Sequence, residues 1–512
     1  MIAAAACAAL YGIDAFAVSL EVDCARQGLP GFSMVGLAEG AVREAKERVF
    51  AALKNAGFRL PPARITVNLA PADRRKEGSG FDLPLALALL AAAEMLPAEA
   101  LAGWHACGEL SLTSELRSVP GVLPLAIRAR AEGARGLLCP TANAAEAAVV
   151  EGLDVYPVAS LGQAVAHLSG ERPLTPLAVD LATLWNEREQ FHIDFAEVKG
   201  QEHAKRAIEI AAAGGHNLLF VGPPGSGKTM LAQRIPSVLP PLTFDEALEV
   251  TKIYSVAGRL GSNQALVVTR PFRSPHHTIS DAGLVGGGTY PRPGEVSLSH
   301  RGVLFLDELP EFKKSALEVL RQPLEDGEVT ISRAAMSLSY PADMMLVAAM
   351  NPCPCGYLTD SRHACTCAPP QLQRYRSRLS GPLLDRIDLH VDVPAVHHTD
   401  LMQRASGADS ASMRGRIFAA RDRQARRYAG TPCRTNADLS GKWLETFCPL
   451  EAEHRTFLEK AVQRLGLSAR AFTRVLRIAR SIADLEGADP LRVEHLAEAI
   501  NYRSLDRHSS AA

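Results

Sequence analysis

The pattern of hydrophobic and polar positions divides the chain into three blocks. In the first block, residues 41–53 place apolar side chains on one face of a helix and charged side chains on the other. Residues 65–69 are rich in β-branched side chains and precede a turn containing Pro and Asp, which is typical of a strand. The first block therefore predicts an α+β domain that combines short strands with Ala-rich helices.

The second block contains three short, uninterrupted apolar runs, at residues 217–221, 303–306 and 346–350. Runs of this kind are typical of strands that are buried on both faces of a parallel sheet. Helical patterns lie between the runs, so the second block predicts a doubly wound α/β domain.

The third block is predicted to be helical, because residues 472–483 repeat apolar side chains at the spacing of one helix face. A stretch with Pro and charged residues and no sustained periodicity separates the first block from the second. The chain as a whole is therefore predicted to belong to the α/β class. The expected parts are an α+β domain at 1–168, a linker at 169–195, an α/β core at 196–398 and a helical domain at 399–512.

Composition narrows the class of protein. The chain has 512 residues, of which 47% are hydrophobic and 22% are charged, a balance typical of a globular protein with several domains. The formal net charge is −1, so binding of nucleic acid would have to use a local basic surface. No apolar run reaches the ~18–20 residues of a membrane span, and the apolar N-terminus lacks the basic region of a signal peptide. We therefore expect a cytoplasmic protein without membrane contact, in which the 10 cysteines serve as free thiols or metal ligands.

Residues 222–229, the phosphate loop, carry the strongest chemical signal in the sequence. They match G-x-x-x-x-G-K-[ST] at every fixed position, follow an apolar run and open a helical segment. In this arrangement glycines let backbone N–H groups surround phosphates, and the start of the helix adds positive potential. We expect Lys228 to reach the β- and γ-phosphates of ATP and the hydroxyl group of Thr229 to bind Mg²⁺. The residues expected to contact ATP are Gly222, Pro223, Pro224, Gly225, Ser226, Gly227, Lys228, Thr229 and Met230.

Two acidic residues, Asp307 and Glu308, directly follow the apolar run 303–306. A buried parallel strand would deliver both carboxylates to its carboxyl end, which is where ligands bind in open α/β sheets. We expect Asp307 to hold Mg²⁺ through water, together with Thr229. We expect Glu308 to orient and deprotonate the attacking water, which predicts hydrolysis of ATP rather than binding alone.

Three further polar residues carry no decisive signal of their own. Asn351 ends an apolar run and is placed either to position a water molecule beside the γ-phosphate or to cap the turn before Pro352. An arginine close to the γ-phosphate neutralises charge in the transition state, often from a neighbouring subunit. Arg386 and Arg470 are candidates for this role, although the local sequence alone is equally compatible with ordinary surface arginines.

Four cysteines follow Asn351 with the spacing C-x-C-x9-C-x-C, namely Cys353, Cys355, Cys365 and Cys367. Four thiolates within so short a segment can close a tetrahedral Zn²⁺ site. His363 lies between the two pairs and is able to replace one thiolate as a ligand. Free thiols on a loop, or a redox-active pair, are the alternatives.

Taken together, GPPGSGKT, VLFLDE, the strand before Asn351 and LLDRID resemble the AAA+ ATPases of the helix-2-insert group. Longer stretches resemble one branch of that group, the ComM/YifB family of magnesium-chelatase-like ATPases. These stretches are RPFRSPHHTIS (270–280), GEVSLSHRGVLFLDELPEF (294–312), NPCPCGYLTD (351–360) and SGPLLDRIDLHVDVP (380–394), and the resemblance covers the chain from about residue 5 to 503.

The resemblance assigns roles to residues that the local sequence leaves open. It implies that Asn351 is the sensor-1 residue, that Arg386 is the arginine finger and that the C-terminal helices form a lid. It places the sensor-2 arginine at Arg470, with Arg474 and Arg477 as alternatives on the same helix face. The expected catalytic set is Lys228, Asp307, Glu308, Asn351, Arg386 and Arg470.

The N-terminal block resembles a Lon-protease-like domain. The loop at residues 76–82 corresponds to the loop of the Lon nucleophile, and it contains Ser79. The segment that should supply the lysine of the catalytic dyad, residues 108–129, contains no lysine. A serine without its base is a poor nucleophile, so we expect no peptidase activity.

The resemblance implies a homo-hexameric, ATP-driven DNA motor that catalyses branch migration during homologous recombination and natural transformation, with other recombination proteins as expected partners. Such a motor would contact phosphates of single-stranded or branched DNA and show little sequence specificity. The expected DNA-contacting residues are Arg270, Arg273, His276 and His277 of an inserted segment, and Arg333 in a hairpin at 329–338. The arginines of segment 414–427 are expected to form a solvated helix face, with DNA binding as the alternative. The alternatives are a magnesium-chelatase-type motor that remodels a protein partner, and an ATP-dependent protease or protein remodeller.

Overall fold

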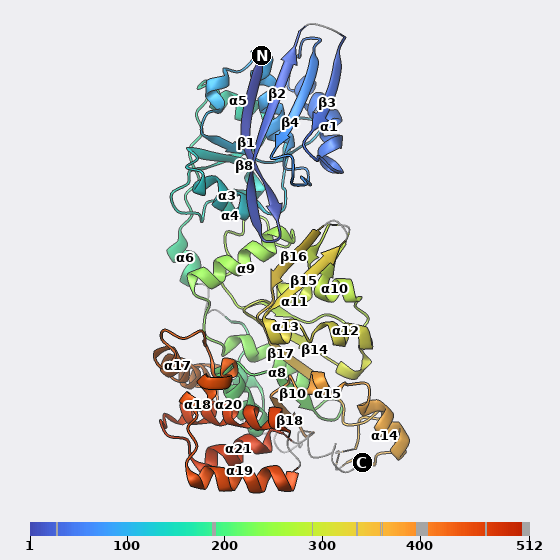
Figure 1. Ribbon diagram of the computed structural model, residues 1–512, viewed down its shortest axis with the longest axis vertical. Helices are drawn as coiled ribbons and strands as arrows, with labels where there is room; N and C mark the ends of the chain where they lie inside the picture. The colour runs from blue at the N-terminus through green and yellow to red at the C-terminus, as the bar shows by residue number, and fades with distance from the viewer. Residues whose placement is uncertain are drawn as a thin grey trace.

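The computed structural model describes residues 1–26, 29–186, 191–288, 290–333, 336–358, 360, 362–395, 408–465 and 468–503. The molecule is elongated, with a large sheet at one end, a cluster of helices at the other and an α/β core between them (Figure 1). The two main sheets have seven and five strands. The mixed α/β class expected from the sequence is confirmed. Within the described ranges, every helix is too short or too polar to cross a bilayer.

The N-terminal sheet is mixed and has the order β3-β4-β2-β1-β5-β8-β9. Its strands are β1 (Ile2–Tyr11), β2 (Asp14–Ala25), β3 (Gly31–Val35), β4 (Arg64–Ala70), β5 (Trp104–Ala106), β8 (Gly136–Pro140) and β9 (Val155–Val158). Strand β2 runs antiparallel to both β1 and β4, and the other neighbouring strands are parallel. A small antiparallel pair, β6 (Glu109–Leu110) and β7 (Leu116–Arg117), lies outside this sheet.

Helices cover the N-terminal sheet and complete its core. They are α1 (Ala41–Asn55), α2 (Asp82–Ala92), α3 (Val122–Ala131), α4 (Ala144–Ala147) and α5 (Leu161–Leu168). Helix α1 contains the segment predicted from its apolar face, and Val42, Ala45, Val49 and Leu53 are buried as expected. Every residue of α2 is buried, which explains why its sequence is apolar all round and shows no periodicity.

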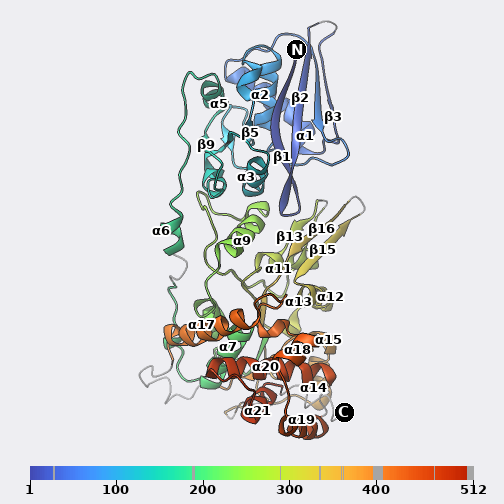
Figure 2. The same cartoon turned by 60° about the vertical axis from the view of Figure 1, so that its left-hand side comes forward.

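A long segment without sheet pairing connects the N-terminal domain to the core. After α5 the chain descends along the side of the molecule to the short helix α6 (Leu181–Asn186), as Figure 2 shows. Leu177 hydrogen-bonds through its N–H to the carbonyl of Val155 at 2.8 Å, so part of the segment is attached to the N-terminal sheet.

The core contains a five-stranded, entirely parallel sheet with the order β11-β14-β17-β10-β18. Its strands are β10 (Leu218–Val221), β11 (Phe272–Arg273), β14 (Val303–Leu306), β17 (Met345–Met350) and β18 (Leu389–Asp392). Three of them are the apolar runs predicted to be buried strands. Alternate residues of β10 and β14 enter two different hydrophobic cores, one with α7 (Glu202–Gly214) and the C-terminal helices, the other with α12 (Lys314–Val319). Both faces of this sheet are therefore covered.

An insert and a hairpin extend from the core toward the N-terminal domain (Figure 1). The insert contains α10 (Asp281–Val285), β12 (Gly286–Gly287), β13 (Arg292–Pro293) and α11 (Glu295–Leu298), and the hairpin consists of β15 (Glu328–Arg333) and β16 (Met336–Pro341). Tyr340 is fully buried and donates from its hydroxyl group to the carbonyl of Pro291 at 2.6 Å, which joins hairpin and insert. The turn between β1 and β2 reaches the same region, since Tyr290 donates to the carbonyl of Leu10 at 3.0 Å.

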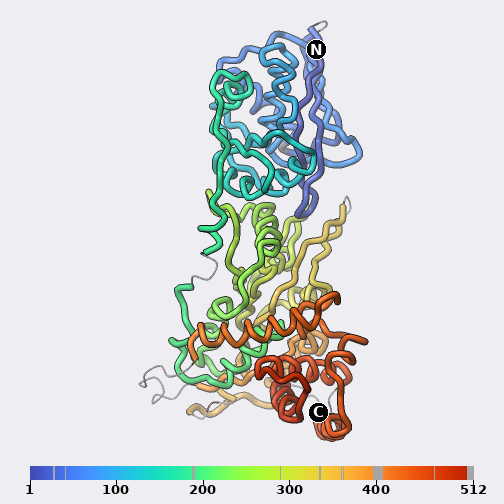
Figure 3. The backbone as a smooth tube through the Cα atoms, turned by 90° about the vertical axis from the view of Figure 1, so that its left-hand side faces the viewer, coloured from blue at the N-terminus to red at the C-terminus, as the bar shows by residue number. Residues whose placement is uncertain are grey.

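The C-terminal helices gather at the end of the molecule opposite to the N-terminal sheet (Figure 3). They are α17 (Ser410–Arg427), α18 (Gly441–Phe447), α19 (Ala452–Leu465), α20 (Ala469–Glu486) and α21 (Val493–Asn501). Helix α20 contains the predicted amphipathic segment 472–483. Helix α17 packs on α7, and its arginines bind there: Arg421 donates to the carbonyl of Ala212 at 2.8 Å, and Arg416 pairs with Glu209. The expectation of a solvated arginine face on this helix is therefore wrong for these two arginines, whereas Arg426 is 73% exposed as expected.

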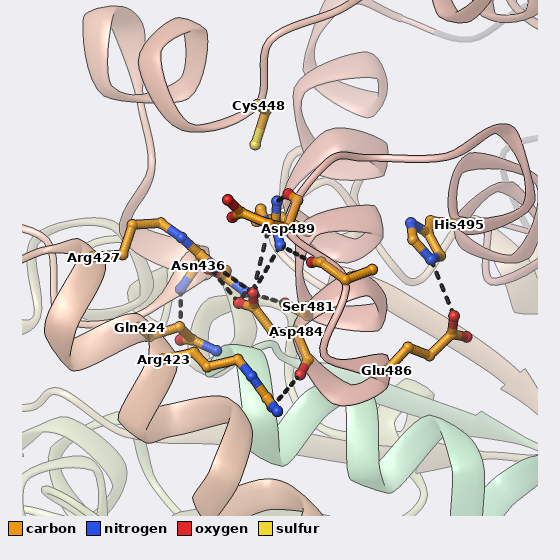
Figure 4. A network of polar contacts seen from close by, with 12 residues as sticks. Arg423, Gln424, Arg427, Asn436, Cys448, Ser481, Asp484, Glu486, Asp489 and His495 are labelled. Carbon is orange, nitrogen blue, oxygen red and sulfur yellow. Dashed lines mark hydrogen bonds and ion pairs between the residues drawn. The ribbon is translucent and has the colours of Figure 1, made fainter.

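A buried carboxylate, Asp484, organises the polar interior of these helices (Figure 4). Its oxygens accept hydrogen bonds from Arg427 at 2.5 and 2.9 Å, from Arg480 at 3.0 and 3.2 Å and from Asn436 at 2.9 Å. The side chain of Asp484 is 0% exposed. Since a buried charge is tolerated only when paired and hydrogen-bonded, this network ties α17 to α20.

Candidate nucleotide-binding site

The phosphate loop connects β10 to α8 (Lys228–Arg234), as expected from the sequence. Gly225 and Gly227 have φ values of 73° and 90°, a left-handed backbone that favours glycine. A Cβ atom at position 222 would lie 2.1 Å from the carbonyl oxygen of Val393, so this position also requires glycine. The loop is therefore packed tightly at Gly222 and open at Gly225, where a Cβ would meet nothing within 4 Å.

The ammonium group of Lys228 lies inside the loop. It donates to the carbonyls of Gly222 and Pro223 at 2.8 and 2.9 Å and to Oδ1 of Asn351 at 3.3 Å. Burial lowers the pKa of Lys228 from its usual value, against the raising effect of Asp307 and Glu308. The lysine of the motif and the asparagine at the end of β17 are thus brought into direct contact.

Thr229 and Asp307 meet at the neighbouring point of the sheet. The hydroxyl group of Thr229 donates to Oδ2 of Asp307 at 2.7 Å, and the other carboxylate oxygen accepts from the N–H of Glu308 at 2.9 Å. A hydroxyl group and a carboxylate side by side are oxygen ligands of the kind that Mg²⁺ takes in phosphate-transfer sites.

Glu308 points toward the inserted segment. Its backbone has φ 52°, a left-handed conformation that is uncommon for a residue other than glycine. Its Oε2 atom lies 3.3 Å from Nδ1 of His277, a residue that follows β11. The carboxylate is 57% exposed, so a water molecule can reach it.

The residues of the loop fit phosphate as a ligand. The hydroxyl oxygen of Ser226 is buried and, within the described part of the chain, has no hydrogen-bond partner. A buried polar atom normally has a partner, so this hydroxyl group is available for an oxygen ligand of the loop. Together with the glycine backbone and the buried Lys228, it forms a donor set suited to the phosphates of ATP.

The two candidate arginines lie in a second cluster. Arg386 pairs with Glu325 of α13 (Pro323–Asp326) and donates to the carbonyl of Pro382 at 2.8 Å. Arg470 is 70% exposed and lies 3.5 Å from Asp385. Among the described residues, no hydrogen bond or ion pair joins either arginine to Lys228 or Glu308 of the same chain.

The two alternatives to Arg470 are engaged inside the molecule. Arg474 lies 3.6 Å from the buried Asp388, and Arg477 donates to the carbonyl of Leu439 at 2.6 Å. Burial lowers the pKa of Arg474. Of these three arginines, Arg470 is therefore the one exposed to solvent, where it is 70% accessible.

The four cysteines after Asn351 converge. The Sγ atoms of Cys353, Cys355, Cys365 and Cys367 all lie within 4.8 Å of one another. His363 pairs instead with Asp360 at 3.5 Å and is 62% exposed, so it lies outside this cluster.

Several contributors to the site carried no recognisable signal in the sequence. Gln201, which has φ 59° at the start of α7, donates to the carbonyls of Ser226 and Pro394 at 3.3 and 2.7 Å and so supports the phosphate loop. The role of Glu325 is likewise not predictable from the sequence, since a glutamate on a short helix carries no distinguishing pattern. Only the folded chain shows that it pairs with Arg386.

In the N-terminal domain, Ser79 and Lys76 lie near each other in sequence but do not form a dyad. The ammonium group of Lys76 is buried and bound by the carbonyls of Gly36 and Pro71. No hydrogen bond among the described residues joins the hydroxyl group of Ser79 to a base.

Comparison with known proteins identifies the family. Residues 194–401 match magnesium chelatase, subunit ChlI; residues 20–143 match subunit ChlI of Mg-chelatase, and residues 407–503 match its C-terminal part. The chain is 46% identical over 503 residues to the competence protein ComM of Haemophilus influenzae, covering 98% of this chain and 97% of that protein. It is 45% identical over 501 residues to the uncharacterized protein YifB of Salmonella typhimurium, covering 98% and 96%. The chain belongs to the ComM/YifB family of magnesium-chelatase-like proteins.

Membership of the ComM/YifB family confirms the resemblance seen in the sequence motifs. It makes the chain a member of the AAA+ ATPases and implies ATP and Mg²⁺ as its nucleotide and metal. The likeness to a chelatase subunit is more limited. The chain is 28% identical over 166 residues to the magnesium-chelatase 67 kDa subunit of Chlorobaculum parvum, covering 31% of this chain and 23% of that protein.

Proposed function

We propose that this ComM/YifB protein is an ATP-hydrolysing ring motor that moves along DNA and catalyses branch migration. The observation that supports ATP hydrolysis is the convergence of Lys228, Thr229, Asp307, Glu308 and Asn351. These residues follow β10, β14 and β17, three neighbouring parallel strands, at the edge where ligands bind in open α/β sheets. One relative, ComM of Haemophilus influenzae, is named a competence protein, which agrees with a role in the uptake and recombination of DNA.

Each residue of this group has a role that follows from its position. The phosphate loop and Lys228 bind the negative phosphates, and Thr229 and Asp307 hold Mg²⁺, which neutralises phosphate charge when bound. Glu308 accepts a proton from the attacking water. Asn351 orients that water. Its side-chain oxygen lies 3.3 Å from the ammonium group of Lys228, which places the amide beside the group that binds the phosphates.

A ring of subunits, which we propose to be a homo-hexamer, accounts for the two distant arginines. Arg386 and Arg470 lie together around Asp385 and Glu325 but do not contact the Lys228 of their own chain. They would complete the site of a neighbour, where a guanidinium group stabilises charge on the transferred phosphoryl group. Arg386 acts as the arginine finger and Arg470 as sensor 2 in this proposal.

The DNA-facing surface is proposed to include the hairpin β15–β16. Its exposed face carries Arg333, which lies over Gly287 of the insert. Arg270 and Arg273 do not belong to this surface, because the first binds the carbonyl of Arg301 at 2.6 Å and the second forms a double hydrogen bond with Glu295. Contacts to phosphates from one or a few arginines predict weak dependence on sequence.

Three further features belong to the proposal: a second metal ion, the cellular location and the limits of the domains. Zn²⁺ is proposed as a second metal, held by the four cysteines, and the protein is proposed to act in the cytoplasm with other recombination proteins. We also propose the domain limits 1–168, 196–398 and 399–512, separated by a linker at 169–195.

The test is the ATPase rate of the purified protein with single-stranded, duplex and four-way DNA. We expect DNA to stimulate hydrolysis, Lys228→Ala to abolish it and Glu308→Gln to retain bound ATP without turnover. Lys460→Ala, on the exposed face of α19, is the matched control and should hydrolyse ATP like the unchanged protein. Hydrolysis at the unchanged rate by Glu308→Gln would show that another group activates the water.

A second candidate is a motor that remodels a protein partner, as suggested by the similarity to the magnesium-chelatase 67 kDa subunit. The same assay separates the two candidates. A protein-remodelling motor would hydrolyse ATP at a rate that none of the three DNA forms changes, and the lack of stimulation would exclude the DNA motor.

A further inference from the structure

Four sulfur atoms in the loop after Asn351 lie at the separations of a shared metal ion. The distance from Sγ of Cys353 to Sγ of Cys355 is 3.3 Å, that from Cys353 to Cys365 is 3.7 Å, and that from Cys355 to Cys365 is 3.6 Å. Tetrahedral zinc with Zn–S bonds of about 2.3 Å separates its sulfur ligands by about 3.8 Å. A disulfide would require a separation of about 2.05 Å. The observed distances therefore match ligands of one ion and exclude a formed disulfide among these three pairs.

The local backbone explains how two C-x-C pairs can meet. Gly356 has φ 88°, and its N–H binds the carbonyl of Cys353 at 3.0 Å, which turns the chain sharply after the first pair. The N–H of Cys355 donates to Sγ of Cys367 at 3.4 Å, which fixes the second pair against the first. Backbone N–H groups pointing at sulfur are a common support for metal-bound thiolates.

The turn that carries the first pair lies directly on the phosphate loop. A Cβ atom at position 356 would lie 2.6 Å from Cδ of Pro224 and 4.0 Å from Cγ of Asn351. Gly356 thus sits between the loop that binds phosphate and the residue proposed to orient water. No other residue type fits at this position without moving one of them.

We propose that Cys353, Cys355, Cys365 and Cys367 bind one Zn²⁺ ion and that this ion holds Gly356 between Pro224 and Asn351. The zinc site is inferred from the sulfur geometry alone. The role of the ion in positioning Gly356 rests on the proposed function, because it concerns the nucleotide site. The ion has a structural role: it closes the segment 353–367 into a compact unit, and through Gly356 that unit sets the position of the phosphate loop and of Asn351.

The four-thiolate arrangement favours zinc over a redox pair. A redox pair uses two sulfurs, whereas here the four sulfurs lie within 4.8 Å of one another. Four thiolates without an open position are typical of structural zinc sites, which bind no substrate. Neither His363, which is 62% exposed, nor any other ligand type belongs to this cluster among the described residues.

The first test measures the metal. The full-length protein, purified without chelators, should contain about one zinc per chain by elemental analysis, and the double variant Cys365→Ser/Cys367→Ser should contain none. The variant Cys433→Ser, in a buried lid cysteine outside the cluster, is the control and should keep its zinc. Because the double variant can fail to fold, Co²⁺ substitution of the unchanged protein is a second measurement. It should give the strong visible absorption of a tetrahedral thiolate site. Zinc well below one per chain together with no cobalt spectrum would overturn the proposal.

The second test measures the connection to the nucleotide site. Gly356→Ala leaves all four ligands in place, so it should keep its zinc while its KM for ATP rises roughly tenfold, the effect usual for a displaced supporting residue. Gly381→Ala, where a Cβ would meet nothing within 4 Å, should keep both properties. An unchanged KM and kcat in Gly356→Ala would refute the connection while leaving the zinc site intact. If the unchanged protein binds zinc but hydrolyses no ATP, the proposed function fails and the metal site stands.

Discussion

The buried charge network at Asp484 leads to a quantitative prediction for the stability of the lid. The side chain of Asp484 is 0% exposed, and Arg480, one of its two charged partners, is 2% exposed. In Asp484→Asn the shape of the side chain is retained, but the guanidinium groups of Arg427 and Arg480 lose the carboxylate that they share. Both cations remain where water cannot solvate them fully.

The magnitude follows from the cost of an unpaired buried charge. Removing one partner of a buried ion pair costs about 3–5 kcal/mol, whereas an exposed pair contributes about 0–1 kcal/mol. Helix α17, which carries Arg427, offers a matched exposed pair, Asp422 with Arg426, whose side chains are 65% and 73% exposed. Asp484→Asn should therefore destabilise the packing of α17 on α20 by several times more than Asp422→Asn.

Amide hydrogen exchange of α17 and α20 measures this difference where it arises. We expect Asp484→Asn to reduce protection of these helices by roughly two to four orders of magnitude, since about 1.4 kcal/mol corresponds to a factor of ten. Asp422→Asn should change protection by less than about fivefold. Equal protection in the two variants would show that apolar packing, and not the charge network, holds the lid together.

Three further predictions concern the arginine finger, the base of the sheet and the hairpin. Glu325→Gln removes the carboxylate that holds Arg386, so the ATPase rate at low protein concentration should rise by up to about fivefold. Asp388→Asn should lower the free energy of unfolding at pH 7. Burial raises the pKa of Asp388, but the hydrogen bond with His216 acts against this effect, and the net result is a pKa below its usual range, so the charged carboxylate stabilises the fold. That contribution is present above the unfolded pKa of about 3.9 and is lost as the pH falls below it, so the difference in urea unfolding should shrink in acid. Arg333→Ala should weaken DNA binding by a similar factor for all sequences and reduce its salt dependence.

Each of these variants has a matched control. Asp326→Asn, next to Glu325 and exposed, should leave the ATPase rate unchanged. If Glu325→Gln instead lowers the ATPase rate, Glu325 holds Arg386 in its active position, and the prediction is wrong. Asp489→Asn, an exposed lid carboxylate, should show the same urea midpoint as the unchanged protein at both pH values. Arg455→Ala, on the exposed face of α19, should not alter DNA affinity, and an equal loss in both arginine variants would indicate nonspecific attraction.

The strands and the phosphate loop could be predicted because their signals are local. A run such as 303–306 is apolar at every position, and only a strand with both faces covered explains this. The motif at 222–229 fixes its own backbone through glycine, so its shape does not depend on distant residues. The contact of Lys228 with Asn351 then follows from the order of the parallel strands.

The remaining features depend on contacts between residues far apart in sequence. Arg270 looks like a surface arginine, yet it binds the carbonyl of Arg301. The partners of the α17 arginines could not be predicted either, because a basic helix face is equally compatible with solvent, DNA or buried carbonyl groups. Gln201 gives no signal at all, since its role depends on a left-handed backbone that places its amide beside the phosphate loop.

The contact between Tyr290 and Leu10 has a mechanical consequence. Strand β1 contains 10 residues, so at about 3.3 Å per residue it spans about 33 Å from its contact with the insert to its far end. Its pairing with β2 along the whole length makes the two strands stiff. A tilt of the two strands by about 10° at the contact would displace their far end by roughly 6 Å. A small rotation near the insert would therefore be amplified at the distal end of these strands.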